Sequence, residues 1–192
     1  MNESPESVTP FLAPLAALQR LLSHFGERGT VIGGIAASLL GKPRLTADLD
    51  AVLLLSINEI PDLLKAAEKE GLTPRIREVE DFARQHRVVL LRHAEIETNI
   101  DISLGILPFE EELVARSATF QVGSLSIRLP SPEDLIILKA VAHRPKDLMD
   151  IQAVIENYPD LDRDRVEYWV TQFAQALEAP ELWEDIAGWL PK

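Results

Sequence analysis

The first part of the chain carries apolar residues at the spacing of an amphipathic helix. The positions that share one face are Leu12, Leu15, Leu18, Leu21 and Leu22. Thr9 and Pro10 suit the cap and first turn of such a helix, and Gly26 suits its end. The pattern therefore predicts a helix over residues 9–25.

A strand, a helix and a second strand are expected next, over residues 30–32, 35–40 and 48–55. The glycine pair Gly33-Gly34 separates the first two of these elements. Beyond them the pattern predicts a helix over residues 56–70, a helical turn over 81–86, a hairpin of strands over 87–92 and 96–104, a helix over 109–116, and one or two strands over 120–129.

The last third of the chain is expected to be helical. Ser131 followed by Pro132 and acidic residues is a strong helix start. Further helices are predicted over residues 147–156, 162–177 and 180–189. All three tryptophans lie in this part, where we expect them to pack the helices together or to form a face for a partner.

This order of elements predicts an α+β fold, with a small mixed sheet and flanking helices followed by a helical C-terminal half. We expect the core to span residues 1–129 and the helical region to span residues 130–192. The two are expected to pack as one compact unit.

Composition places the chain among ordinary globular proteins, with 46% hydrophobic and 26% charged residues among its 192. The chain has no cysteine, which excludes disulfides and thiolate metal sites. No apolar run reaches the ~18 residues of a membrane span, and the start lacks a basic and apolar leader. We therefore expect a cytoplasmic protein without a membrane partner.

The formal net charge of −12 argues against a broad basic face for nucleic acid. A nucleic-acid substrate would have to be held by a local cluster of Lys and Arg, by metal, or by a basic partner. A small phosphate-bearing ligand needs only the local cluster.

Two carboxylates open the strand predicted over residues 48–55. Alternate strand residues share a face, so Asp48 and Asp50 should point the same way with Cβ atoms roughly 6.6 Å apart. Such a pair can hold one divalent ion or two neighbouring ions. The alternative is a pair at the start of a strand that stays in water.

Gly33 and Gly34 stand between a predicted strand and a predicted helix. Glycines at this point let backbone N–H groups approach a phosphate at the positive end of the helix dipole. An ordinary tight turn explains the glycines equally well by themselves. The order strand, glycine pair, helix, polar turn and Asp-Leu-Asp strand is more specific than either motif alone.

This order resembles the nucleotidyltransferase signature of the DNA polymerase β superfamily. A hydrophobic residue and Gly33-Gly34 are followed by thirteen residues and then by Asp48-Leu49-Asp50-Ala51. The fuller string GGIAASLLGKPRLTADLD resembles the AbiEii-like, abortive-infection branch, which includes toxin nucleotidyltransferases. The resemblance implies an NTP substrate and Mg²⁺ (or Mn²⁺). Gly34 departs from many superfamily members, which carry serine there, so a hydroxyl contact to phosphate is missing.

A third carboxylate in this family arrives on a later strand, and Asp101 is the candidate here. Asn99, Asp101 and Ser103 fall on one face of their strand, and Ile100 and Ile102 fall on the other. If this strand lies beside the Asp48 strand, three acids meet and repel one another unless a cation offsets their charge. A solvated face is the alternative for Asp101.

Two further acids compete with Asp101 for the role of third carboxylate. They are Glu95 and Glu97, which precede it along the chain.

The string SPEDLIILKAVAHRPKDLMD holds the second cluster. By the resemblance, Lys139 contacts nucleotide phosphates, Asp147 is an active-site acid of a later motif, and Arg144 belongs to the nucleotide site. A lone Lys on a helix is otherwise most often a surface residue. Asp150 lies one helical turn after Asp147, and we expect it to cap or solvate its helix rather than to enter the site.

The turn before the Asp48 strand carries two more nucleotide-binding candidates, Arg44 and Thr46. Arg44 could clamp a phosphate or pair with a site carboxylate. An exposed turn residue is the equal alternative.

The sequence therefore predicts an enzyme that transfers a nucleotide from an NTP to a hydroxyl of RNA, protein or a small molecule. Asp48, Asp50 and Asp101 are the expected metal ligands. A toxin of this kind would have an antitoxin or other protein partner. The alternative is an inactive binding or antitoxin-like module that keeps the fold, motivated by Gly34 and the acidic surface.

Overall fold

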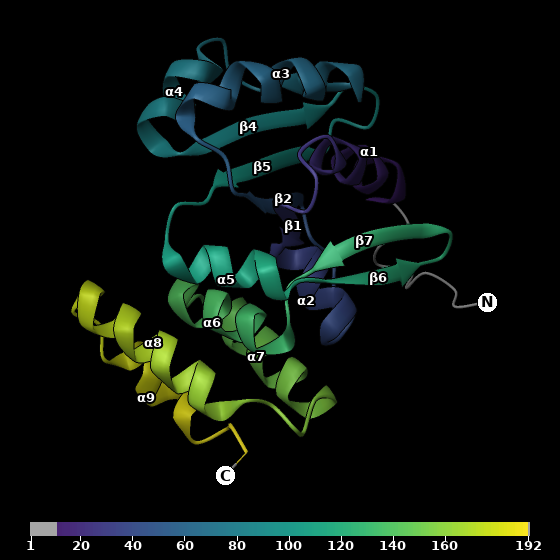
Figure 1. The fold of residues 1–192 in the computed structure, drawn as a ribbon. Helices are drawn as coiled ribbons and strands as arrows, with labels where there is room; N and C mark the ends of the chain where they lie inside the picture. The colour runs from purple at the N-terminus through teal and green to yellow at the C-terminus, as the bar shows by residue number, and fades with distance from the viewer. Residues whose placement is uncertain (1–10, 192) are drawn as a thin grey trace.

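A five-stranded mixed sheet forms the centre of the upper part of the protein (Figure 1). The computed structural model describes residues 11–191. The strands are β1 (Gly29–Ile32), β2 (Asp48–Leu53), β3 (Leu72–Pro74), β4 (Val88–His93) and β5 (Asn99–Leu104). Their spatial order is β1-β2-β5-β4-β3, with β2 and β5 parallel and the other neighbours antiparallel.

Three helices pack against one another and against β1, β3 and β4. They are α1 (Leu12–Ser23), α3 (Ile60–Lys69, preceded by the short η2, Ile57–Glu59) and α4 (Val79–His86). Burial alternates along β5, where Ile100 and Ile102 are fully buried and Asp101 between them is partly exposed. One face of the sheet is therefore core, and the other leaves polar side chains accessible.

The helix α2 (Gly33–Leu40) follows β1 and contacts β2, α6 and α7. After β5 come α5 (Pro108–Arg116) and a second hairpin, β6 (Ala118–Val122) and β7 (Leu125–Leu129). The hairpin packs on the main sheet, and the Thr30 hydroxyl of β1 donates to the Arg128 carbonyl of β7 at 3.2 Å. The sheet edge at β1 is covered in this way.

The C-terminal helices make up the lower part of the protein (Figure 1). They are α6 (Pro132–Ala142), α7 (Pro145–Asn157), α8 (Arg163–Leu177) and α9 (Glu181–Ala187). As expected, the Ser131 hydroxyl caps α6 by accepting from the Asp134 amide at 3.2 Å. Phe109 of α5 packs on Trp169 and Phe173 of α8, with ring centroids 5.3 and 5.5 Å apart. These contacts join the helical region to the core.

The α+β prediction is confirmed, and the differences are local. Thr9 and Pro10 lie outside the described residues. The strand β3 was not predicted, because it is only three residues long and contains Pro74, which is confined to sheet edges. The strand predicted from residue 96 begins at Asn99, since Glu97 adopts a left-handed conformation (φ 55°) in the connection from β4.

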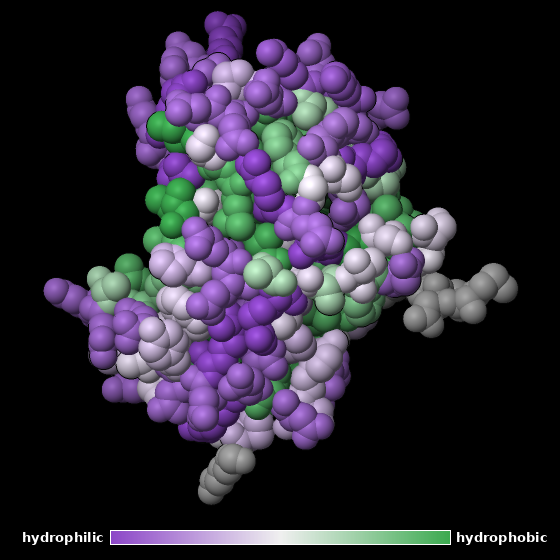
Figure 2. Space-filling view, in the orientation of Figure 1, coloured by the Kyte–Doolittle hydropathy of each residue, from purple (hydrophilic) through white to green (hydrophobic). Residues whose placement is uncertain are grey.

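None of the helices in residues 11–191 has the length and apolar character of a membrane span. Figure 2 shows apolar surface gathering between the upper part and the lower helices, whose front is polar. Ile106 and Leu107, in the loop between β5 and α5, are among the exposed large apolar residues.

Candidate active site

Three carboxylates occupy one face of two parallel strands. Asp50 of β2 lies directly opposite Asp101 of β5, and Asp48 lies opposite Asn99. Residues that are directly opposite in a sheet share a face, so Asp48, Asp50 and Asp101 project to the same side. All three are partly exposed. The shared face on which the metal hypothesis depends is present.

The two alternatives to Asp101 lie elsewhere. Glu95 and Glu97 are exposed in the turn between β4 and β5, and Glu97 pairs with Arg92 at 3.8 Å. Asp101 is therefore the third carboxylate of this face.

Burial and mutual repulsion perturb this carboxylate group. Burial raises the pKa of Asp50 above its ordinary value, and the charges of Asp48 and Asp101 raise it further. Burial also raises the pKa of Asp101, and Asp48 adds to that shift. Among residues 11–191 no three His, Asp or Glu side chains are grouped so that they could hold a metal ion as they stand. A cation that drew these carboxylates together would relieve their repulsion, so the donor set fits a divalent ion in its chemistry.

A glycine corner closes around Asp50. Gly33 adopts a left-handed backbone (φ 68°), and a Cβ on Gly33 would lie 1.9 Å from Asp50 Oδ2. The Gly34 backbone N–H, at the start of α2, donates to the Asp50 carboxylate and lowers its pKa. Glycine at position 33 is therefore required both by conformation and by the approach of a carboxylate.

Arg75 is a site residue that the sequence did not indicate. Its Nη2 donates to Asp101 Oδ1 at 2.7 Å, and its charge lowers the pKa of Asp101 against the effect of burial. Arg75 follows β3, the short edge strand, and its amide donates to the Leu90 carbonyl of β4. Because that strand was not recognised, no signal linked Arg75 to the site.

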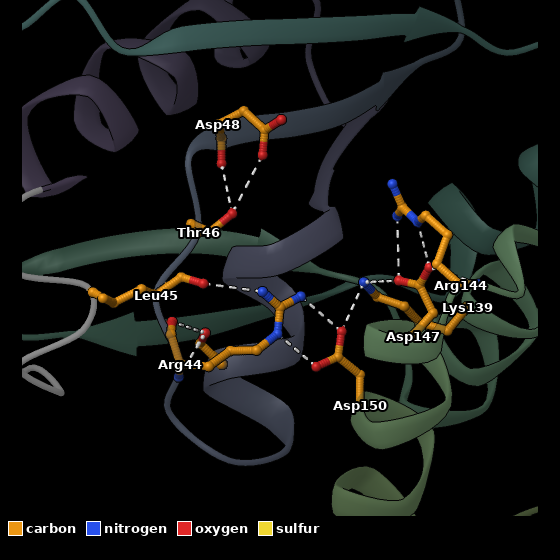
Figure 3. A network of polar contacts seen from close by, with 9 residues as sticks. Arg44, Leu45, Thr46, Asp48, Lys139, Arg144, Asp147 and Asp150 are labelled. Carbon is orange, nitrogen blue, oxygen red and sulfur yellow. Dashed lines mark hydrogen bonds and ion pairs between the residues drawn. The ribbon is translucent and has the colours of Figure 1, made fainter.

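A buried ion network lies beside the carboxylates (Figure 3). The Lys139 Nζ atom of α6 lies 2.8 Å from Asp147 Oδ1 and 2.9 Å from Asp150 Oδ2, both on α7. The side chains of Lys139 and Asp150 are each 5% exposed, and that of Asp147 is fully buried. Lys139 is therefore not the surface residue that a lone helical Lys usually is.

Two arginines extend the network toward solvent. Arg44 binds Asp150 through Nε and Nη2 at 2.6 and 2.8 Å, and Arg144 binds Asp147 through Nε and Nη2 at 2.5 and 3.2 Å. Burial would raise the pKa of both Asp147 and Asp150, but the bound cations outweigh it and hold both pKa values below the ordinary value. The expectation that Asp150 is solvated was wrong, because Asp147 in the first turn of α7 and Asp150 one turn later both face α6 and the α2–β2 loop.

The network and the carboxylates influence each other. The charge of Lys139 lowers the pKa of Asp50. Asp147 raises the pKa of Arg144 most strongly, and Asp50 and Asp48 contribute to that shift. The site therefore combines a carboxylate side with a cationic side.

Thr46 lies between these two sides, in the loop that leads into β2. Its hydroxyl lies 3.3 Å from both the carbonyl oxygen and Oδ1 of Asp48 (Figure 3). Every residue predicted for the site except the two rejected glutamates thus lies in or next to this group.

A glycine corner, carboxylates on neighbouring parallel strands and adjacent cations are the arrangement expected of a nucleotidyltransferase, and the family comparison shows that the protein is of this class. The model of the family described as "Nucleotidyl transferase AbiEii toxin, Type IV TA system" matches residues 16–185. The chain belongs to this AbiEii family. A search of curated proteins gives no match.

Solved structures share the fold at low sequence identity. An antigenic nucleotidyltransferase-like protein from Paracoccidioides brasiliensis is 15% identical, with a TM-score of 0.58 over 99% of this chain and 96% of that one. The antibiotic-resistance factor ANT(2'')-Ia is 15% identical, with a TM-score of 0.56 over 88% and 95%. JHP933 from Helicobacter pylori is 16% identical, with a TM-score of 0.51 over 97% and 81%.

Proposed function

We propose that this protein transfers a nucleoside monophosphate from an NTP to a hydroxyl acceptor in a reaction that depends on a divalent metal. We propose further that it is the toxin component of a toxin–antitoxin pair acting in the cytoplasm. Family membership supports the chemistry. The observation that carries the site assignment is the register of β2 and β5, which sets Asp50 opposite Asp101.

Asp48, Asp50 and Asp101 are the residues that would hold Mg²⁺ or Mn²⁺. When bound, the ion would offset charge on the triphosphate and on the leaving pyrophosphate. Asp101 would also accept the proton of the attacking hydroxyl. That oxygen bonds to the α-phosphorus as the bond to pyrophosphate breaks.

The cationic side of the site would bind the triphosphate. Lys139, Arg44 and Arg144 are three cations facing the two carboxylates Asp147 and Asp150, which leaves one net positive charge. Asp147 and Asp150 hold these cations in place beside the carboxylate face. Catalysis in this arrangement rests on positioning and electrostatics.

The glycine corner would let the nucleotide's phosphates approach the backbone closely. Gly33 and Gly34 offer N–H groups at the start of α2 and no side chain that could block access. The Gly34 N–H, which donates to Asp50, would be shared or released when phosphate binds.

The acceptor is RNA, protein or a small molecule, and a single assay separates the three. Transfer from each labelled NTP is measured against total RNA, lysate protein and aminoglycosides. An antitoxin or other protein partner is sought by co-purification. A stable partner without any transfer would favour an inactive binding module instead.

The metal and nucleotide sites are tested by calorimetric titration of Mg²⁺ and of each NTP. Binding of NTP should require Mg²⁺ and should be lost in Asp48→Ala and Asp50→Ala. Asp62→Ala is the matched control, because Asp62 is an exposed acid on α3 paired with Lys65. NTP binding that is unchanged in the site variants would overturn the proposal.

A further inference from the structure

Thr46 fills the space that a side chain at position 34 would need. A Cβ built on Gly34 would lie 2.4 Å from Thr46 Oγ1 and 2.8 Å from Thr46 Cβ. Real Cβ atoms do not approach other atoms this closely, so no side chain fits at position 34 while Thr46 stays in place. The Thr46 hydroxyl thus stands where the first side-chain atoms of residue 34 would otherwise lie.

The hydroxyl of Thr46 is weakly engaged in this structure. Both of its contacts with Asp48 are 3.3 Å long, whereas O–H···O hydrogen bonds are usually about 2.5–3.0 Å. A hydroxyl has one hydrogen to donate, so at most one of these long contacts can be a full hydrogen bond. A charged oxygen at ordinary distance would make a stronger acceptor.

The same point in space is next to a cation. Arg44 Nη2 lies 3.6 Å from the position of the Gly34 Cβ. The Thr46 hydroxyl and the Arg44 guanidinium come from the same loop (Figure 3), and both lie close to the first turn of α2. This pairing of a neutral donor with a positive charge suits a phosphate oxygen.

The loop that carries Thr46 is held in place from two sides. Arg44 is bound by Asp150 of α7, and its carbonyl accepts from the Ser38 hydroxyl of α2 at 3.0 Å. The segment two residues before Thr46 is therefore fixed to both α2 and α7.

We propose that the Thr46 hydroxyl donates to the triphosphate and supplies, from across the loop, the side-chain donor that Gly34 lacks. This inference rests on the proposed function, since it requires a nucleotide at this site. The space beside the first turn of α2 has room for the side chain of residue 34 or of residue 46, but not for both. The hydroxyl then comes from position 46.

The first test compares Thr46→Val with Thr46→Ser by calorimetry, using ATP, GTP, CTP and UTP in the presence of Mg²⁺. Loss of a hydrogen bond to a charged group should weaken binding of the preferred NTP in Thr46→Val by roughly tenfold or more. Thr46→Ser keeps the hydroxyl and should recover most of the affinity. Thr119→Val, an exposed threonine on β6, is the matched control and should bind like wild type.

The second test exchanges the two positions. Gly34→Ser should weaken binding because its Cβ collides with Thr46, and Thr46→Gly should weaken it because the hydroxyl is lost. Gly34→Ser/Thr46→Gly should bind more tightly than either single variant, since the new hydroxyl has room. Thermal melting of each variant establishes that it is folded.

The outcomes separate this inference from the proposed function. If wild type binds an NTP, Asp50→Ala does not, and Thr46→Val binds like wild type, the inference fails while the proposed function stands. Losses that simply add in the double variant would also overturn it. If wild type binds none of the four NTPs with Mg²⁺, both proposals fall.

Discussion

Arg44 and Asp150 lie 106 residues apart in the chain and form a bidentate ion pair, with distances of 2.6 and 2.8 Å. The pair fastens the loop before β2 to the first turns of α7. Asp150 also forms an ion pair with Lys139, so one buried carboxylate binds two cations of the site. The carboxylate side and the cationic side are held together by this contact.

Removal of Asp150 should therefore destabilise the whole protein. Asp150→Ala leaves Lys139 buried with one partner fewer, and we expect the free energy of unfolding to fall by roughly 3 kcal/mol. This is the lower end of the range for buried pairs, because Asp147 still faces Lys139. Urea denaturation measures the change. Glu156→Ala removes an exposed pair with Lys42 and should cost less than about 1 kcal/mol, and an equal loss in both variants would contradict the assignment.

Gly33 and Gly26 offer a matched pair of substitutions. Both have a left-handed backbone, with φ of 68° and 67°, but only at Gly33 would a Cβ meet another atom within 4 Å, namely Asp50 Oδ2. Alanine at either position should cost about 1–2 kcal/mol of backbone strain. Only Gly33→Ala should also abolish Mg²⁺-dependent NTP binding in a calorimetric titration. Retained binding in Gly33→Ala would show that the corner tolerates a side chain.

Arg75 should compete with a divalent ion for Asp101. Its guanidinium holds Asp101 Oδ1 at 2.7 Å, so Arg75→Gln frees the carboxylate and removes a repelling charge. We expect a severalfold smaller Kd for Mn²⁺. Arg84→Gln, which breaks a surface pair with Glu80 on α4, is the control and should leave the Kd unchanged. Weaker Mn²⁺ binding in Arg75→Gln would mean that Arg75 orients Asp101 instead.

Acidification should weaken metal binding, and the loss should begin at a higher pH than it would in a site made of ordinary carboxylates. Burial raises the pKa of Asp50 and of Asp101, so protons compete with the ion above the usual carboxyl range. The rise in Tm caused by Mn²⁺ should be largest near neutral pH and should shrink as the pH falls. A Tm rise independent of pH across this range would contradict the assignment.

Without metal, the same shift makes the ionised form of Asp50 destabilising. The protonated carboxyl of Asp50 contributes stability at low pH, and this contribution is lost as the pH rises through the raised pKa of the folded state. Asp50→Asn should accordingly melt at a higher temperature than wild type at neutral pH in the absence of metal, and should show no Mn²⁺ effect. A lower melting temperature without metal would contradict the predicted sign.

The core and the helical C-terminal region should unfold together. All three tryptophans lie in the C-terminal region, and Trp169 packs on Phe109 of the core. Tryptophan fluorescence therefore reports the C-terminal region, whereas far-UV circular dichroism reports the whole chain. We expect the two urea transitions to coincide. Separate midpoints would instead place a domain boundary near residues 129–131.

Local spacing was enough to predict much of the site. Asp48 and Asp50 share a face because strand side chains repeat every two residues, and Gly33 and Gly34 mark the strand-to-helix corner because side chains are excluded there. Ser131 capped its helix as expected, because capping involves residues only three positions apart. Each of these features depends on neighbours in the chain.

The partners of the charged residues could not be predicted in the same way. Asp150 looked like a solvated helix acid, and Arg44 could equally have been an exposed turn residue. Whether such a side chain is buried depends on which elements pack beside it, and α7 brings Asp150 to Arg44 and Lys139. Arg75 reaches Asp101 through a three-residue edge strand too short to leave a pattern.

The sequence by itself determined most of the elements, the face shared by Asp48 and Asp50, and the family resemblance, because these depend on local periodicity and short motifs. Only the tertiary structure decided that Asp101 faces Asp50, that Lys139 lies between two buried acids, and that Thr46 occupies the space beside Gly34. These contacts join residues of different helices, strands and loops, and their energies depend on burial and on opposite charges that only packing brings together.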